Sequence, residues 1–287
     1  MKKPQWITIG IALLLVTGIF FFGKTTPGKK NIVVETHSAD DGHDHGNQAT
    51  ISIDSILVMA KKQLGSDQVT RISMLENSIS RGDVKEQQLK VYHQLSHFWG
   101  DSMRLFAPYA WYEAEAARLE NSEKTLTFAA HLFLENLQQE QNPALLKWEA
   151  EQAKDLFERS LKINPDNDSS KIGLGATYLF GNISTNPMEG LGKIMEVVNK
   201  DSTNIYAQMT LVKGSILSGQ IDKAINRLTT VNRLQPDNIE AILMLAEVYE
   251  RKGDKATAAG WYKKSLEHIK RADVRTEIEK RITELSK

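Results

Sequence analysis

Histidine is the side chain here most able to do chemistry, because its imidazole binds metals and titrates near neutral pH. Three of the seven histidines stand in one acidic stretch, which reads His37, Asp40, Asp41, His43, Asp44 and His45. Imidazole and carboxylate groups could hold a divalent cation there, and a solvated spacer would have the same composition. A flexible stretch presets no ligand geometry, so we predict no metal site.

His93 and His97 lie four residues apart, which is metal-ligand spacing on a helix. The segment reads HQLSH, so Gln94 stands where a zinc peptidase has the glutamate that acts as general base. The sequence offers no third ligand for them. We therefore interpret the two histidines as structural.

The remaining motifs are also weak. Gly173-Leu174-Gly175 copies part of a nucleotide-binding fingerprint but falls within a helical pattern and not after a strand. Asp166-Asn167-Asp168 lacks the rest of a calcium loop and suits a turn and helix cap. The aromatic residues Phe98, Trp99, Tyr109, Trp111 and Tyr112 favour core packing over a pocket. We predict no catalytic residue and no cofactor.

Composition excludes several classes of protein. The 36 basic and 36 acidic residues give no net charge, whereas a nucleic-acid binder normally carries a basic excess. The absence of cysteine excludes disulfides, thiol catalysis and cysteine-bound zinc.

The N-terminus carries an uncharged apolar run. A short tail, 1–5, precedes residues 6–23, which read WITIGIALLLVTGIFFFG. At about 1.5 Å per residue such a helix spans nearly the hydrocarbon core of a bilayer. No small-x-small cleavage site follows, so we predict an uncleaved transmembrane anchor, with a cleaved signal peptide as the alternative. Lysines flank both ends, so charge leaves the orientation almost tied.

Residues 24–50 hold proline, glycine and the histidine cluster and predict a flexible linker. From residue 51 the apolar residues follow helical periodicity and no segment alternates as a strand would. We expect an all-α chain. The predicted helices cover 53–65, 67–81, 83–99, 102–120, 123–141, 143–163, 168–181, 187–199, 204–218, 220–234, 238–252, 254–268 and 271–286.

Residues recur at a spacing of 34. Leu211, Gly219 and Ala224 precede Leu245, Gly253 and Ala258 by this distance. A further copy lies upstream, with Leu174, Gly175 and Tyr178 in its first helix, a turn that is three residues longer, and Gly190 in its second helix. Small residues at fixed positions let two helices approach closely, and Leu, Tyr and Phe fill the space beside them.

These positions resemble the tetratricopeptide repeat, most clearly over residues 147–270. The resemblance implies a superhelix of antiparallel helix pairs with a concave groove. Accordingly we divide the chain into a divergent helical region, 51–122, tetratricopeptide-like repeats, 123–272, and a capping helix, 273–287.

In the register of this family, ligands contact the inner face of each first helix. The positions that this predicts for a partner-binding groove are Ile172, Ala176, Phe180, Tyr206, Met209, Lys213, Leu217, Leu243, Glu247, Glu250 and Arg251. Such a groove suits an extended segment or amphipathic helix of another protein. The polar clamp by which some family members hold a chaperone's C-terminal carboxylate is absent, because Ile172, Ala176 and Thr210 occupy its positions.

We therefore expect a non-catalytic scaffold, anchored by residues 6–23, that binds proteins and no nucleic acid. The layout resembles bacterial inner-membrane proteins with periplasmic repeats, among them accessory factors of translocation and cytochrome c maturation. One alternative is a self-associating structural component of the envelope. Another is an enzyme whose site would bring His93, His97 and His131 into one cleft.

Overall fold

Residues 51–81, 84–183 and 187–287 are described by a computed structural model of the chain. The predicted membrane anchor, 6–23, the linker, 24–50, and the histidine cluster within that linker lie outside these residues. None of the helices in the described ranges is long and apolar enough to cross a bilayer.

The described ranges are helical throughout and contain no strand, as the periodicity predicts. The N-terminal helices are α2 (Ile53–Lys61), α3 (Ser66–Arg81), α4 (Lys85–His97), α5 (Phe106–Glu120), α6 (Glu123–Leu137) and α7 (Pro143–Ile163). They are followed by α8 (Asp168–Phe180), α9 (Pro187–Lys200), α10 (Ile205–Leu217), α11 (Ile221–Leu234), α12 (Ile239–Arg251), α13 (Lys255–Ser265) and α14 (Ala272–Leu285).

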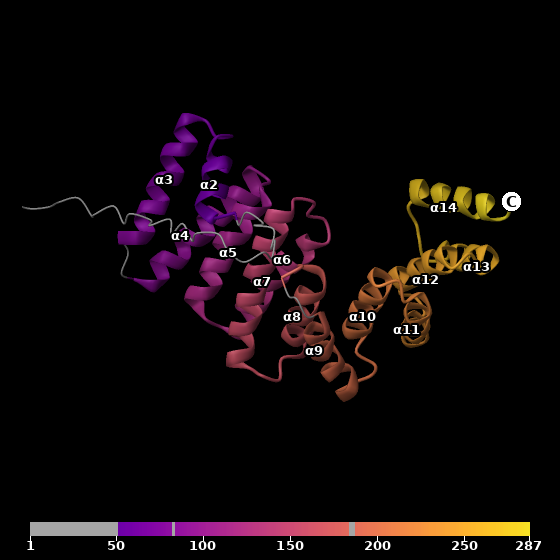
Figure 1. Cartoon of the computed structure of the whole chain (residues 1–287). Helices are drawn as coiled ribbons and strands as arrows, with labels where there is room; N and C mark the ends of the chain where they lie inside the picture. The colour runs from indigo at the N-terminus through magenta and orange to yellow at the C-terminus, as the bar shows by residue number, and fades with distance from the viewer. Residues whose placement is uncertain (1–50, 82–83, 184–186) are drawn as a thin grey trace, which may run out of the picture. The chain divides into compact units, whose positions relative to one another are not determined.

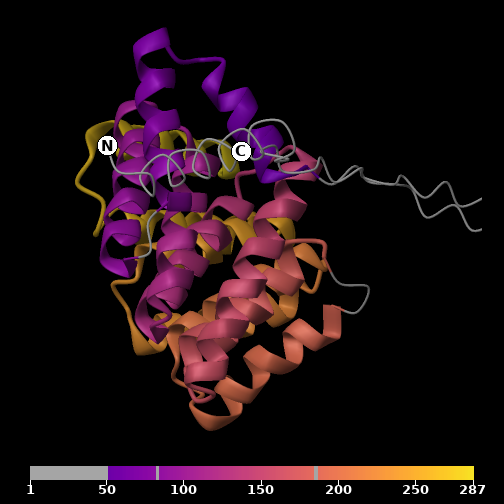
Figure 2. The same cartoon turned by 90° about the vertical axis from the view of Figure 1, so that its left-hand side faces the viewer.

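Helices that follow one another in the chain pack as pairs, and each pair packs on the next. The pairs are α4–α5, α6–α7, α8–α9, α10–α11 and α12–α13 (Figure 1). Figure 2 shows the same helices after a quarter turn. Contacts also join α5 to α6, α7 to α8, α9 to α10 and α11 to α12. Each pair therefore covers an apolar face that its neighbour would otherwise expose to water.

The apolar core is divided in the same way. One cluster of buried side chains joins α2, α3, α4 and α5, and a second spans α5 to α8 with Ile56 of α2. A third joins α8 and α9 to α10, and a fourth spans α10 to α12. Leu245 and Ala246 of α12 are fully buried, as is Ala258 of α13, and Tyr262 donates a hydrogen bond back to Glu250 of α12. The side chains that the 34-residue register places between paired helices do meet there.

Asparagine starts three successive first helices. The side chains of Asn167, Asn204 and Asn238 accept hydrogen bonds from the backbone at the starts of α8, α10 and α12. A side-chain oxygen at this position satisfies one of the backbone N–H groups that a helix leaves unpaired. The turns within the α10–α11 and α12–α13 pairs are also alike, since Gly219 and Gly253 adopt left-handed φ angles of 71° and 86°. These recurring caps and turns fix where each helix begins and ends.

The chain departs from the predicted helices between α4 and α5. A helix over 102–120 is expected, but a π-helical turn, η1 (Phe98–Ser102), continues α4, and α5 begins only at Phe106. Gly100 allows this turn, because a Cβ there would come within 2.9 Å of the Tyr109 ring. Arg104 then takes a left-handed φ of 53°. This close approach depends on tertiary packing, which periodicity does not reveal.

Helix α14 follows the last pair, as expected for a capping helix. Ile278 and Leu285 form its buried side, and the rest of its surface is largely exposed and charged.

Candidate functional site

The first helix of each pair lies beside the first helix of the next. We call α6, α8, α10 and α12 the first-helix row. His131 of α6 forms a hydrogen bond with Ser169 of α8, with 2.9 Å between Nε2 and Oγ. Lys213 of α10 reaches Glu240 of α12, with 3.2 Å between Nζ and Oε1. These contacts join α6 to α8 and α10 to α12 within the row.

The predicted groove residues differ in their access to solvent. Ile172, Ala176 and Met209 are buried in the apolar cores between helices, so a partner that leaves the fold intact does not reach them. Tyr206 is 39% exposed and Leu217 is 70% exposed. The others are partly or fully exposed: Phe180, Lys213, Leu243, Glu247, Glu250 and Arg251. The most exposed apolar residues of the predicted groove therefore lie at the two ends of α10.

Tyr206 belongs to a small aromatic group. Its ring centroid lies 5.7 Å from that of His131, which in turn lies edge-on to Phe157 at 5.0 Å. Burial lowers the pKa of His131, and the Glu135 carboxylate offsets this only in part. The imidazole is therefore neutral at pH 7, which suits its place between two rings. Contacts with these rings support the Tyr206 side chain, which can offer both apolar and polar contacts to a partner.

The C-terminal end of the row is charged, and part of that charge is already paired. Arg281 of α14 forms an ion pair with Glu250 of α12. Tyr262 also donates a hydrogen bond to Glu250 at 3.3 Å. A partner would have to displace these contacts to use Glu250, whereas Glu247 and Arg251 remain exposed.

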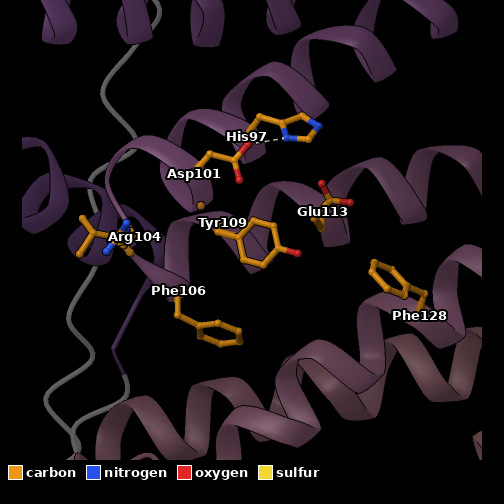
Figure 3. Close-up of a pocket in the computed structure, with 9 residues that line it drawn as sticks. His97, Asp101, Arg104, Phe106, Tyr109, Glu113 and Phe128 are labelled. Carbon is orange, nitrogen blue, oxygen red and sulfur yellow. Dashed lines mark hydrogen bonds and ion pairs between the residues drawn. The ribbon is translucent and has the colours of Figure 1, made fainter.

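A pocket of about 570 Å³ opens beside the π-helical turn (Figure 3). It is bounded by α4, η1, α5 and one residue of α6, and its lining includes His97, Asp101, Arg104, Phe106, Tyr109, Glu113 and Phe128. The Tyr109 ring stands between Phe106 and Glu113 (Figure 3). Phe128, the contribution of α6, is 56% exposed. Aromatic walls with a few polar groups are typical of pockets that accept an apolar side chain or small ligand.

The polar groups of this pocket are held by local contacts. His97 Nδ1 lies 3.0 Å from Asp101 Oδ2, and His93 Nδ1 lies 3.7 Å from Glu113 Oε1. Ser96 donates a hydrogen bond to the same Glu113 carboxylate. Burial, and then the carboxylates of Glu113 and Asp101, raise the pKa of Tyr109. Its phenol therefore stays protonated and can donate a hydrogen bond at neutral pH.

The three histidines of the enzyme alternative do not form one cluster. His93 and His97 each face a different carboxylate, and His131 contacts Ser169, Phe157 and Tyr206. Across 51–81, 84–183 and 187–287, no group of three histidine or acidic side chains is arranged to hold a metal ion.

Sequence reasoning missed part of this pocket. Of the aromatic residues that it assigned to the core, Trp99 and Tyr112 are indeed buried, but Tyr109 lines the pocket. It did not select Phe106 and Phe128, because a phenylalanine at helical spacing normally signals core. The break in helical pattern around Gly100 was the available signal.

No protein-family model matches the sequence, and neither does any curated protein. Solved structures with similar folds include residues 41 to the end of MamA from Desulfovibrio magneticus RS-1, at 24% identity and a TM-score of 0.44. That match covers 65% of this chain and 96% of the other. YrrB, described as a TPR protein with an unusual peptide-binding site, matches at 14% identity and a TM-score of 0.41, covering 72% and 97%. The packed pairs and 34-residue register of the present chain give its described helices a tetratricopeptide-like fold.

Proposed function

We propose that this chain is a non-catalytic scaffold that binds a segment of another protein along the first-helix row. The observation that carries the proposal is the exposure of Tyr206 and Leu217 on α10, at the centre of that row. Exposed aromatic and aliphatic side chains on a rigid helix supply apolar contact area at little entropic cost. An extended segment or an amphipathic helix could use them as anchor points.

The pocket beside η1 provides a second anchor point for the same kind of partner. Phe128 lines it from α6, which also carries His131 of the Tyr206 group. A partner segment crossing α6 could therefore place one apolar side chain in the pocket and another against Tyr206. Two such anchors would fix the direction in which the segment lies.

Anchoring through residues 6–23 is also part of the proposal, with the helical stack in the bacterial periplasm. Its support is the uncharged run itself and the linker that follows it. A membrane anchor confines the search for a partner to two dimensions. Translocation and cytochrome c maturation are the envelope processes in which such an accessory factor would fit.

Crosslinking in the native membrane tests the binding surface. We expect full-length protein with a photoreactive amino acid at position 213 to capture a discrete partner, and Tyr206→Ala with Leu217→Ala to abolish that adduct. Ile163→Ala is the matched control, because Ile163 is 45% exposed at the end of a second helix. Unchanged capture by the double variant would contradict the groove assignment. Adducts formed only between copies of this chain would favour the self-associating alternative.

Protease protection tests the anchor. Protease added to intact spheroplasts should digest residues 51–287 and leave a membrane-bound N-terminal fragment. Full protection of the helical stack would place it in the cytoplasm, and complete release into the medium without protease would indicate a cleaved signal peptide.

A further inference from the structure

A second pocket, of about 410 Å³, lies between the α8–α9 and α10–α11 pairs. Its apolar wall includes Leu179 at the end of α8 and Leu191 and Met195 on α9. Its other wall carries two basic residues of α11, Lys223 and Arg227. Among the described residues, no aspartate or glutamate lines this pocket. The combination of an apolar wall with uncompensated positive charge points to an anionic, largely apolar ligand.

Arg227 is the unusual residue of the pocket. It is half-buried, yet its guanidinium meets only neutral groups, with Nη1 2.9 Å from Gln208 Oε1 and Nη2 3.7 Å from Met195 Sδ. Burial lowers its pKa. An arginine stays charged in proteins, so this cation is partly removed from water without a carboxylate in the described ranges to balance it.

Other half-buried arginines in the described ranges have acidic partners. Arg118 bonds to Asp155 at 2.9 Å and to Glu115 at 2.9 Å. Arg275 lies 4.0 Å from Glu279. Arg227 therefore departs from the pattern that this chain otherwise follows. A carboxylate supplied from outside would restore that pattern and gain a charge-assisted hydrogen bond.

The rim of the pocket is polar and adjustable. Lys223 donates a hydrogen bond to Gln220 at 2.6 Å, and Gln220 donates one to Ser218 at 2.8 Å. Within the described ranges, Lys223 forms no ion pair with an acidic side chain. A peptide backbone can exchange with such contacts, because its own N–H and C=O groups need partners, whereas an alkyl chain has no use for them.

We propose that this pocket binds an extended segment of a partner protein in which apolar side chains flank a carboxylate. The carboxylate pairs with Arg227 and Lys223, and the apolar side chains lie on Leu191 and Met195. The site lies between two pairs, so Leu179 of α8 and Leu211, Gly214 and Ser215 of α10 line it beside the residues of α9 and α11. It includes neither Tyr206 nor Leu217, and the peptide selection below tests it separately from the function proposed above.

Selection from a phage library of random peptides tests the proposal. The bait is the full-length protein carrying Tyr206→Ala, so that peptides directed at the first-helix row are suppressed, with and without Arg227→Gln. We expect enrichment of sequences with Asp or Glu between Leu, Met or Phe, and loss of that enrichment when Arg227 is replaced. Enrichment that lacks an acidic residue, or persists in the Arg227→Gln bait, would overturn the proposal, as would no enrichment at all.

A selected peptide, labelled with fluorescein, then gives affinities by anisotropy. Arg227→Gln should weaken binding by about tenfold, the loss expected for one charge-assisted hydrogen bond. Lys223→Gln alters an exposed residue and should weaken binding by about threefold without disturbing the fold. Arg233→Gln, on the same helix but outside the pocket, should have no effect.

Two further measurements determine which chemical groups of the ligand the pocket recognises. Replacing the acidic residue of the peptide by its amide should weaken binding to the parent protein and make it insensitive to Arg227→Gln. Decanoate, a carboxylate on an alkyl chain, should displace the peptide only weakly. Tight, Arg227-dependent binding of decanoate with no binding of the peptide would assign the pocket to fatty acids and overturn the peptide proposal.

Discussion

The backbones of Gly175 on α8 and Gly190 on α9 pass so closely that a Cβ on either would lie 2.6 Å from the carbonyl oxygen of the other. Glycine at both positions makes this close contact possible. The repeat pattern places these two glycines at the small positions of the first and second helices, on either side of a turn that is three residues longer than in the next copy. The structure shows that each position needs a glycine, because the backbone of the other helix lies too close to leave room for a side chain.

Alanine at either glycine should therefore separate the two helices. We expect Gly175→Ala or Gly190→Ala to lower the free energy of unfolding by about 2–3 kcal/mol, because backbone cannot move aside as a flexible side chain can. The matched control is Gly192→Ala on α9, where a Cβ meets nothing within 4 Å. That change should raise stability by about 0.5–1 kcal/mol through helix propensity. Urea unfolding followed by circular dichroism measures both, and equal effects would contradict the packing argument.

Two phenylalanines of α6 should separate binding from stability. Phe128 is 56% exposed at the pocket beside η1, whereas Phe133 is fully buried in the core of α5 to α8. Phe128→Ala should change the free energy of unfolding by less than about 0.5 kcal/mol but weaken partner capture. Phe133→Ala should lower stability by about 3–5 kcal/mol. A Phe128→Ala protein that captures its partner as well as the parent does would remove the pocket from the binding surface.

Glu149 makes the stability of the α6–α7 pair depend on pH. This carboxyl is 1% exposed and accepts hydrogen bonds from Asn136 Nδ2 at 3.0 Å to each oxygen. Burial raises its pKa to about 7, an increase that the Asn136 hydrogen bonds oppose and the nearby Glu140 charge supports. A raised pKa means that the folded state holds a proton which the unfolded state releases. This group therefore destabilises the fold progressively from about pH 4.5 to pH 7.

Replacement by glutamine should remove that penalty. Glu149→Gln is expected to raise the free energy of unfolding by about 1–3 kcal/mol at about pH 8, and to change it little near pH 4.5. Urea unfolding of both proteins across this range gives the difference directly. A difference that does not grow as the pH rises would show that the carboxyl titrates normally.

Asp155 should behave in the opposite way. Burial alone would raise its pKa, but hydrogen bonds and charges from Arg118 and Arg159 lower it on balance. A lowered pKa stabilises the fold above the ordinary aspartate pKa, and this contribution disappears as the pH falls through the folded-state value. Since the group is 40% exposed, Asp155→Asn should lower stability by only about 1 kcal/mol at neutral pH. The two proteins should become equally stable in acid, and a difference that persists there would assign the effect to packing.

The repeat register could be read from the sequence because each pair obeys the same local rules. Helices α8 to α14 begin and end within three residues of their predicted limits, where asparagine caps and turn glycines recur. The π-helical turn could not be predicted in this way. It depends on the meeting of Gly100 and Tyr109, two residues whose proximity is a property of the packed fold.

The solvent exposure of the expected groove residues was predicted less completely than the fold. The family register placed Tyr206 and Leu217 on the surface and also selected Ile172, which packs against Ile194 in the core of α8 to α10. The repeat register predicts which face of a helix a residue occupies, but it does not predict how completely the next helix buries that face. The Arg227 pocket was missed because the sequence does not show which residues surround an arginine in space. Only the structure shows that no acidic residue of the described ranges lines this pocket.

Helix α14 covers the last pair with a narrow apolar side and several charged contacts. Ile278 and Leu285 are buried, and Glu277, Lys280 and Glu284 line a pocket beside Tyr262 of α13. Arg281 of the same helix forms an ion pair with Glu250 of α12. Because salt screens exposed charges, the attachment of α14 to the stack should weaken as the ionic strength rises.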